Sequence, residues 1–240
     1  MVGASHFFAA TRQYDRALDL YRKIVLDPRI SDTSPIEWEA AVRHALAITV
    51  RAKKDPSLSM DIVDRVISAP SVPDYLRQDA IRWKASIQEW KDEGSRKSTT
   101  EQGLYAEATR LMDQAAKVQR YTYDRSADIV YLRASSVIHD LMNLAPEGEY
   151  RQKAFLLAGV CYEVLGPLNL GELSEIYFEG CIRTEPHTPV AKTCFERFER
   201  ATYMGYSGSG GTYIPDDVLT RLRELRTLAR VKAPRSTDIP

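Results

Sequence analysis

Apolar side chains recur along this chain at helical spacing, three or four positions apart, and almost nowhere with the alternation of a strand. The two most regular stripes are Leu76, Ala80, Trp83, Ile87 and Trp90, and Val130, Ala134, Val137, Leu141 and Leu144. Such spacing gives an amphipathic helix one apolar face. The pattern therefore predicts a helix over about residues 74–92 and another that ends before Pro146.

Capping signals and breakers delimit further helices. The segments Ser34–Glu37 and Ser98–Glu101 read as capping boxes, and Thr188–Pro189 reads as an N-cap followed by a proline at the first helical position. The first of these opens a helix through about Lys53, and a shorter helix is expected over Met60–Ser68. Together with a last helix from Pro215 to about Arg230, the chain is predicted to be all-α with about ten helices.

The stretch from Phe155 to Pro186 carries a ladder of large and small residues. Its positions are Phe155, Ala158, Gly159 and Tyr162 on a first helix, then Ser174, Phe178 and Cys181 on a second, then Pro186. The small residues Gly159, Ser174 and Cys181 would let the two helices approach closely. The aromatic rings would fill the space around them.

This ladder resembles the tetratricopeptide repeat (TPR), a helix-turn-helix unit of about 34 residues. The resemblance is clearest over 155–186, where the extra length lies in the turn 166–171, and it recurs less completely over 3–28. The second match rests on Phe8, Tyr14, Ala17, Tyr21, Ile24 and Pro28. The resemblance implies antiparallel helix pairs stacked as an α-solenoid. We expect a single array over 1–240, with the polar loop 93–100 as an alternative boundary between 1–92 and 101–240.

What the resemblance implies about function is a non-catalytic scaffold that binds a protein or peptide on its concave face. The first helix of each pair lines that face, which in the clear repeat would expose Leu156, Val160, Glu163 and Val164. An apolar strip with one carboxylate suits a hydrophobic or basic segment better than an acidic one. A C-terminal carboxylate clamp is not expected, because the chain's asparagines do not fall on inner positions of first helices.

The loop Gly205–Tyr213 is rich in glycine and stands before the last helix. A phosphate cradle is disfavoured, because no strand precedes the loop, no Gly-Lys-Ser/Thr ending follows and Pro215 removes one donor. Two interpretations remain, a helix connector and a contact loop. In the second, Tyr203, Tyr206 and Tyr213 supply aromatic anchors for a partner.

A structural subunit of a larger assembly is the alternative function. The last helix looks amphipathic, as a capping helix should, whereas the first repeat has no visible polar cap. Self-association is therefore expected at the N-terminal end, if anywhere. An enzyme ranks third, because no constellation of nucleophile, base and orienting group is visible.

The charge balance and the metal-binding residue types add mainly exclusions. Thirty-three basic and 33 acidic residues cancel, so no nucleic-acid partner is predicted. The basic run from Arg221 to Arg235 is interpreted as a solvated helix face. The four histidines are scattered, so we predict no metal site and no cofactor. Cys161 and Cys181 are interpreted as small buried hydrophobic residues. If the protein is exported, a disulfide of Cys161 with Cys194 or with Cys181 is the alternative, and the sequence does not choose between these pairs.

Neither a membrane span nor a signal peptide is visible. No run of 18 apolar residues occurs, so no membrane insertion is predicted. The start of the chain lacks the features of a secretory signal. The expected location is the cytoplasm if the chain is complete, and the periplasm if an upstream signal has been removed. The excess of arginine over lysine is compatible with a bacterial origin.

Overall fold

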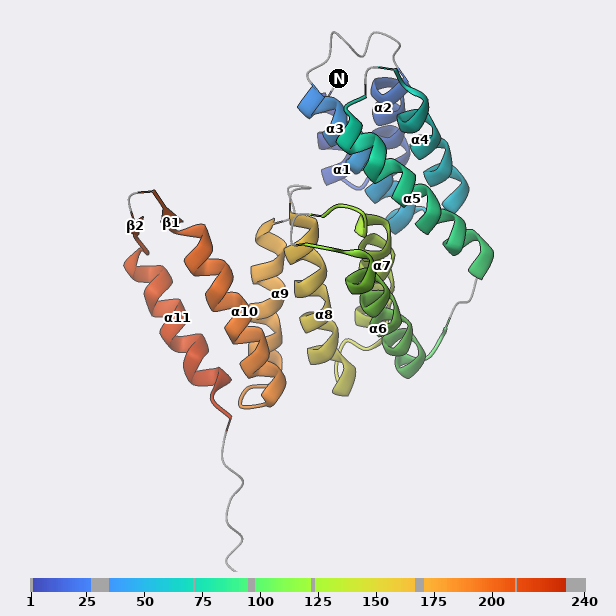
Figure 1. Ribbon diagram of the computed structural model, residues 1–240. Coiled ribbons are helices and arrows are strands. Elements are labelled where there is room, and N and C mark those ends of the chain that lie inside the picture. The colour runs from blue at the N-terminus through green and yellow to red at the C-terminus, as the bar shows by residue number, and fades with distance from the viewer. Residues whose placement is uncertain are drawn as a thin grey trace, which may run out of the picture. The chain divides into compact units, whose positions relative to one another are not determined.

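A computed structural model (Figure 1) describes residues 2–26, 35–70, 72–94, 98–121, 124–166, 171–209 and 211–231. These residues are almost entirely helical, and helices that follow one another in the chain pack together, such as α4 on α5 and α8 on α9. The predicted all-α class is therefore confirmed. The chain divides into two compact units, 1–137 and 138–240.

The first unit contains six whole helices, a π-helical turn and the start of a seventh helix. They are α1 (Val2–Ala10), α2 (Tyr14–Leu26), α3 (Pro35–Ala47), the π-helix (Ile48–Ala52), α4 (Pro56–Ser68), α5 (Asp74–Glu93), α6 (Glu101–Val118) and part of α7 (Asp128–Leu144). The second unit contains the rest of α7, α8 (Glu149–Leu165), α9 (Gly171–Thr184), α10 (Pro189–Gly205), β1 (Ser207–Gly208), β2 (Gly211–Thr212) and α11 (Asp216–Ala229). The described residues thus hold eleven α-helices where about ten were predicted.

Capping side chains fix where several helices begin. Thr188 Oγ1 accepts a hydrogen bond from the Ala191 N–H at 3.0 Å, as its predicted N-cap role requires. The predicted box at Ser98 is wrong, because Thr100 is the N-cap of α6 and its Oγ1 accepts from the Gly103 N–H at 3.2 Å. Ser34, the other predicted cap, lies outside the described residues.

The start of α4 was predicted too late. The helix begins at Pro56 rather than near Met60. Its N-cap is Asp55, whose Oδ1 accepts from the N–H groups of Ser57 and Leu58 at 2.8 and 3.0 Å. An aspartate cap with proline at the first helical position is a strong start signal, and it precedes the first inward-facing residue.

The core of the first unit follows the predicted stripes. The apolar residues buried from α5 and α6 are Leu76, Ala80, Trp83, Ile87, Leu104, Ala108, Leu111 and Ala115. Beside the loop 93–100, Glu93 of α5 pairs with Arg110 of α6 at 3.2 Å and with Arg133 of α7 at 2.5 Å. The helices on both sides of this loop are therefore held together, and the two units divide within α7 instead.

In the second unit, α8 and α9 approach closely at two glycines. A Cβ atom on Gly159 would lie 2.4 Å from the Phe178 ring, and one on Gly180 would lie 3.2 Å from the Phe155 ring. Phe178 then joins a core cluster shared by α9, α10 and α11. Its buried members are Phe178, Cys181, Ile182, Cys194, Phe195, Phe198, Leu222, Leu225 and Ala229.

The remaining residues predicted to pack within the repeat fall on the same two helices or in the turn after them. Tyr162 and Ser174 are buried, Phe155 is half-buried, and Pro186 lies in the turn between α9 and α10. Helices α8 to α11 lie side by side in chain order in Figure 1.

Candidate functional site

The strip predicted to line a concave face is largely engaged within the second unit. Leu156 and Val160 of α8 are half-buried and pack against the core cluster. Glu163 forms two ion pairs with α10, to Arg197 at 2.6 Å and to Arg200 at 2.8 Å. Val164 is half-buried. A partner would therefore meet side chains that already have neighbours in the chain.

The predicted contact loop, in contrast, presents large side chains to solvent. Tyr203, Tyr206 and Tyr213 are 43%, 40% and 82% exposed, and Met204 beside them is 64% exposed. We call these four residues the hairpin surface. Three of them are the tyrosines predicted as anchors, and Met204 is an addition that only the structure supplies.

A short β-hairpin, not predicted from the sequence, shapes this surface. Ser207 pairs with Thr212 and Gly208 with Gly211, and the two hydroxyls of the first pair lie 2.8 Å apart. Gly211 has φ +107°, a backbone angle that residues with a side chain rarely adopt. The Tyr213 N–H continues the ladder by donating to the Tyr206 carbonyl at 3.2 Å. Two-residue strands carry too little alternation to be visible as a pattern.

The hairpin stands on the core of the unit. The Tyr206 N–H closes the end of α10 by donating to the Thr202 carbonyl at 3.1 Å. Thr202 is itself buried, and its hydroxyl donates to the carbonyl of buried Phe198 at 2.9 Å. The hairpin surface is thus held at the junction of two helix ends.

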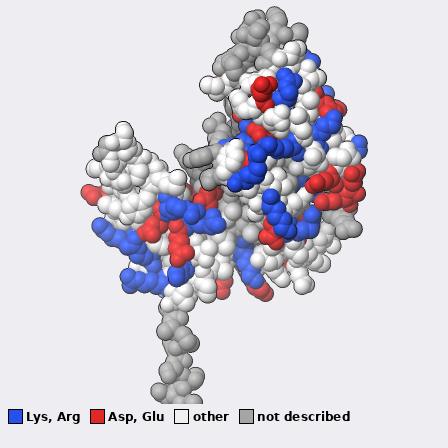
Figure 2. Space-filling model, viewed as in Figure 1, with Lys and Arg blue, Asp and Glu red and all other residues white. Residues whose placement is uncertain are grey.

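Charge is distributed unevenly around the hairpin surface. Residues 201–215 contain no charged side chain, although 28% of the chain is charged. Figure 2 shows the hairpin end of α10 and α11 as a lobe without blue or red atoms, with charges of both signs further along these helices. At its border, Asp216 and Asp217 open α11 and are exposed, and their carboxylates have no hydrogen bond or ion pair to another described residue.

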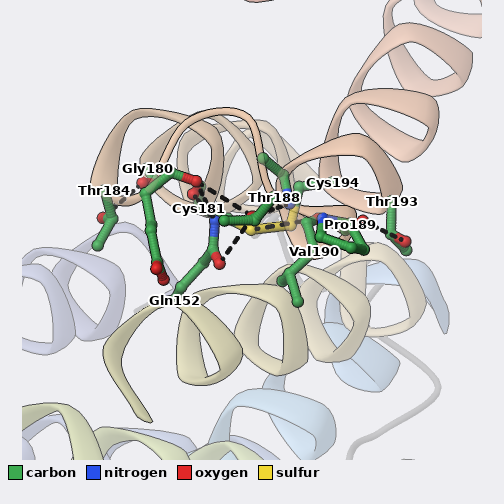
Figure 3. Close-up of a disulfide and its surroundings, with 11 residues drawn as sticks. Gln152, Gly180, Cys181, Thr184, Thr188, Pro189, Val190, Thr193 and Cys194 are labelled. Carbon is green, nitrogen blue, oxygen red and sulfur yellow. Dashed lines mark hydrogen bonds between the residues drawn. A yellow bond between two sulfur atoms is a disulfide. The ribbon is translucent and has the colours of Figure 1, made fainter. Parts of the chain in front are cut away.

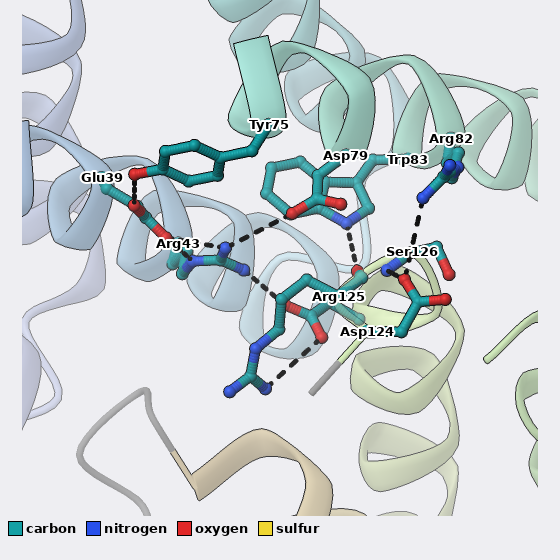
Figure 4. A network of polar contacts seen from close by, with 10 residues as sticks. Glu39, Arg43, Tyr75, Asp79, Arg82, Trp83, Asp124, Arg125 and Ser126 are labelled. Carbon is teal, nitrogen blue, oxygen red and sulfur yellow. Dashed lines mark hydrogen bonds and ion pairs between the residues drawn. The ribbon is translucent and has the colours of Figure 1, made fainter. Parts of the chain in front are cut away.

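A second group of polar residues, in the first unit, is buried (Figure 4). Arg43 of α3 contacts Asp128 at 2.7 Å, Glu39 at 2.8 Å and Asp79 at 3.7 Å, and its guanidinium lies 5.1 Å from the centre of the Trp83 ring. We call these residues the Arg43 network. It connects α3, α5 and the start of α7.

Burial sets the acid–base behaviour of the Arg43 network. Desolvation raises the pKa of Asp128 to about 7 against the pull of Arg43, and it also raises the pKa of Asp79. Nearby, burial alone would raise the pKa of Asp124, but hydrogen bonds from Arg120 and Ser126 hold it well below its usual range. Asp128 is only 4% exposed, whereas Glu39 and Asp79 are half-buried.

One disulfide joins α9 and α10, and it is not a pair that the sequence suggested. Cys181 is bonded to Cys194, with their Cα atoms 6.3 Å apart, whereas Cys161 is buried outside this bond. Neither pair that the sequence left open is therefore formed, and Cys161 is buried, as its interpretation as a small hydrophobic residue predicts. The two bonded cysteines face each other across the short turn after α9, while Cys161 lies on α8.

Hydrogen bonds reinforce the same turn (Figure 3). Gln152 of α8 donates from Nε2 to the carbonyls of Cys181 and Glu185 at 3.0 and 2.7 Å. Its Oε1 accepts from the Thr188 hydroxyl at 3.1 Å. Gln152 is buried, and these bonds satisfy its amide. The turn is thus held by a covalent bond and by α8.

The described arginines of the basic run on α11 are exposed, as a solvated face requires, and some of them also form ion pairs. Arg221 pairs with Glu179 of α9, and Arg226 pairs with Glu199 of α10. Glu224 of the same helix pairs with Arg183 at 2.7 Å. Lys232 and Arg235 lie outside the described residues. The alternating charges of α11 therefore connect it to its neighbours.

An open pocket of about 830 Å³ lies where α8 begins and α9 ends. Its lining residues are Glu147, Gly148, Glu149, Arg151, Phe155, Gly180, Arg183, Thr184 and Glu185. Arg151 lies over the Phe155 ring and Arg183 pairs with Glu179. Because three glutamates line the pocket beside these two arginines, it presents no net positive charge to a ligand.

Sequence reasoning missed the Arg43 network, whose signal would have been charged residues on the inward faces of α3 and α5. In the described residues no group of three or more His, Cys, Asp or Glu is arranged to hold a metal ion. None of the described helices is both long enough and apolar enough to cross a membrane. Comparison with known proteins gave no match to a family model, a curated protein or a solved structure.

Proposed function

We propose that the chain is a non-catalytic scaffold of TPR-like helix pairs that binds a protein partner through the hairpin surface. The observation that carries the proposal is a group of exposed tyrosines in a stretch without charge. Aromatic side chains are enriched at interfaces because they contribute a large contact area with little loss of conformational freedom. A surface held at two helix ends also loses little entropy on binding.

The TPR-like architecture is part of the same proposal. It is supported by the packing of consecutive helices and by the close approach of α8 and α9 at Gly159. The Arg43 network suits a structural role, because the carboxyl group whose pKa is raised to about 7, that of Asp128, is buried. We place the binding site at the hairpin surface and not on the predicted concave strip, because Leu156, Val160 and Glu163 of that strip have partners in the chain.

A capture experiment tests this function. The immobilised chain is incubated with lysate of its source organism, in parallel with a Tyr206→Ser/Tyr213→Ser variant and a Tyr121→Ser control. Tyr121 is 60% exposed and lies outside the hairpin surface. We expect a partner on the parent and the control that is lost from the double variant. A partner that stays on the double variant would refute the role of the hairpin surface.

One observation favours the structural-subunit alternative. Helix α1 contains no Asp, Glu, Lys or Arg, and its Phe7 is 60% exposed. A helix that presents a large apolar side chain without such charges is suited to contact another copy. Light scattering coupled to size exclusion tests this alternative: a dimer of the parent that becomes a monomer in Phe7→Glu would support it.

A further inference from the structure

We infer that the hairpin surface binds an extended, proline-containing peptide segment that carries a basic residue at one end. The inference rests on the proposed function and names the class of partner. It uses three features together: the exposed tyrosines, the absence of charge among them, and the carboxylates at their border.

Exposed tyrosines match the chemistry of a polyproline II segment. Such a segment has no internal hydrogen bonds, so its carbonyl groups remain free to accept them. The Tyr203, Tyr206 and Tyr213 side chains offer both apolar ring faces for proline rings and hydroxyl donors for those carbonyls. Aromatic surfaces recognise proline-rich peptides in this way, helped by the low entropy of the preformed helix.

The absence of charge selects the same kind of segment. No charged residue lies between Arg200 and Asp216 in the sequence. A partner that covers the hairpin surface therefore needs no charged side chain of its own at the centre of the contact. A strongly charged segment would lose hydration without gaining a counter-charge. Proline and small neutral residues avoid this penalty.

The border of the hairpin surface is acidic. Asp216 and Asp217 follow Tyr213 by three and four positions, and their exposed carboxylates have no partner among the described residues. The dipole of α11 contributes about half a positive charge at this end, less than the two carboxylates. On the other side, Arg197 and Arg200 share the single carboxylate of Glu163 at 2.6 and 2.8 Å, which leaves one positive charge there. The end of the surface at Asp216 and Asp217 is therefore the end that attracts a basic residue of the peptide.

The same border argues against an anionic membrane surface as the occupant. Peripheral membrane contact combines apolar residues with free basic ones. Here the free charges next to the hairpin surface are carboxylates, which anionic lipids would repel. A second copy of the chain would bring two more carboxylates close to the first pair.

Fluorescence anisotropy with labelled synthetic peptides tests the inference. Three twelve-residue peptides are compared: polyproline ending in two arginines, the same ending in two glutamates, and a glycine–serine peptide ending in two arginines. We expect the arginine–proline peptide to bind at least about tenfold more tightly than either of the others. Its advantage over the glutamate peptide should shrink as salt screens the exposed charges.

Two variants separate the contributions. Asp216→Asn/Asp217→Asn should make the two proline peptides bind equally, and Tyr206→Ser/Tyr213→Ser should abolish binding of both. Tyr121→Ser is the control, and circular dichroism checks that each variant is folded. Equal binding of the arginine–proline and glycine–serine peptides would overturn the inference, as would binding that survives the tyrosine substitutions.

The capture experiment distinguishes a failure of this inference from a failure of the proposed scaffold function. If no peptide binds, yet a captured partner is lost with the tyrosine substitutions, the inference fails and the scaffold function stands. If no partner is captured but the chain forms a dimer that the same substitutions dissociate, the occupant is a second copy. That result would also overturn the inference.

Discussion

The two units of this chain hold themselves together by different means. The first buries ions: the Arg43 network lies among α3, α5 and α7, and Asp128 within it is only 4% exposed. The second keeps its ion pairs on the surface and closes its core with the Cys181–Cys194 disulfide. Buried charges depend strongly on their partners, whereas exposed pairs contribute little. The stability of the first unit should therefore respond to charge and pH, and that of the second to packing and redox state.

The positions of the tryptophans allow the units to be followed separately. All three, Trp38, Trp83 and Trp90, belong to the first unit. Tryptophan fluorescence therefore reports unfolding of residues 1–137, and far-ultraviolet circular dichroism reports both units. The predictions below use this difference.

The largest expected effect is the loss of Arg43. Arg43→Met should lower the free energy of unfolding of the first unit by about 3 to 5 kcal/mol, because it leaves the buried carboxylate of Asp128 with only the more distant Arg125, at 3.9 Å, as a cation. Urea unfolding followed by tryptophan fluorescence measures it. An Arg43→Met/Asp128→Leu variant should recover much of the loss. A single variant as stable as the parent would show that the network contributes nothing.

Removal of the disulfide should affect the other unit. Cys194→Ala should lower the stability of residues 138–240 by about 3 kcal/mol, since the bond restricts the unfolded chain, and leave the tryptophan transition unchanged. Circular dichroism with and without a thiol reductant measures it. The reductant should destabilise the parent and not the variant. Equal sensitivity of both proteins to the reductant would contradict the pairing.

The pH dependence of the first unit should follow Asp128. Burial raises the pKa of Asp128 from about 3.9 in the unfolded chain to about 7 in the folded one. A raised folded pKa gives stability that is complete below pH 4 and is lost as the pH rises through 7. Between pH 5 and 8 we expect the parent to lose about 2 to 3 kcal/mol relative to Asp128→Asn.

Tryptophan-detected unfolding at a series of pH values measures this difference. Subtracting the asparagine variant removes the opposite contribution of Asp124, whose lowered pKa favours folding as the pH rises above the acid range. A difference between parent and variant that does not change with pH would mean that Asp128 keeps its charge in both states.

The smallest effect concerns packing in the second unit. Gly159→Ala should lower its stability by about 2 kcal/mol, because the new Cβ would lie 2.4 Å from the Phe178 ring and the core must shift. Gly205→Ala is the matched control, since no atom lies within 4 Å of its Cβ position. Thermal unfolding followed by circular dichroism compares them. Equal midpoints would show that α8 and α9 separate freely.

The helices themselves could be read from the sequence wherever a stripe was long and regular. The apolar face of α5 was found from the regular spacing of its apolar residues, and four of the five predicted residues, Leu76 among them, are buried. The stripe of α7 was less reliable at its end, where Leu144 is 45% exposed. Helical spacing identifies a face, but it does not say how far along the helix a neighbour covers that face.

The candidate site was predictable only in part. Tyr203, Tyr206 and Tyr213 stood out because aromatic residues beside glycines are unusual in a helix connector. The strip Leu156–Val164 was placed by the family resemblance, and the structure shows that α9 to α11 occupy much of it. A repeat pattern gives the faces of one helix pair, whereas the next pair decides which of them stays open.

The sequence by itself determined the helical class, most helix boundaries and the close contact at Gly159, because these depend on residues near one another in the chain. Only the tertiary structure decided which cysteines are bonded, that Arg43 meets Asp128, and that the hairpin surface stays uncovered. Each of these depends on which helices pack together: Arg43 and Asp128 lie 85 residues apart, and the bonded cysteines belong to two different helices. Local periodicity carries no record of such distances, since it specifies which way a side chain points and not what it meets.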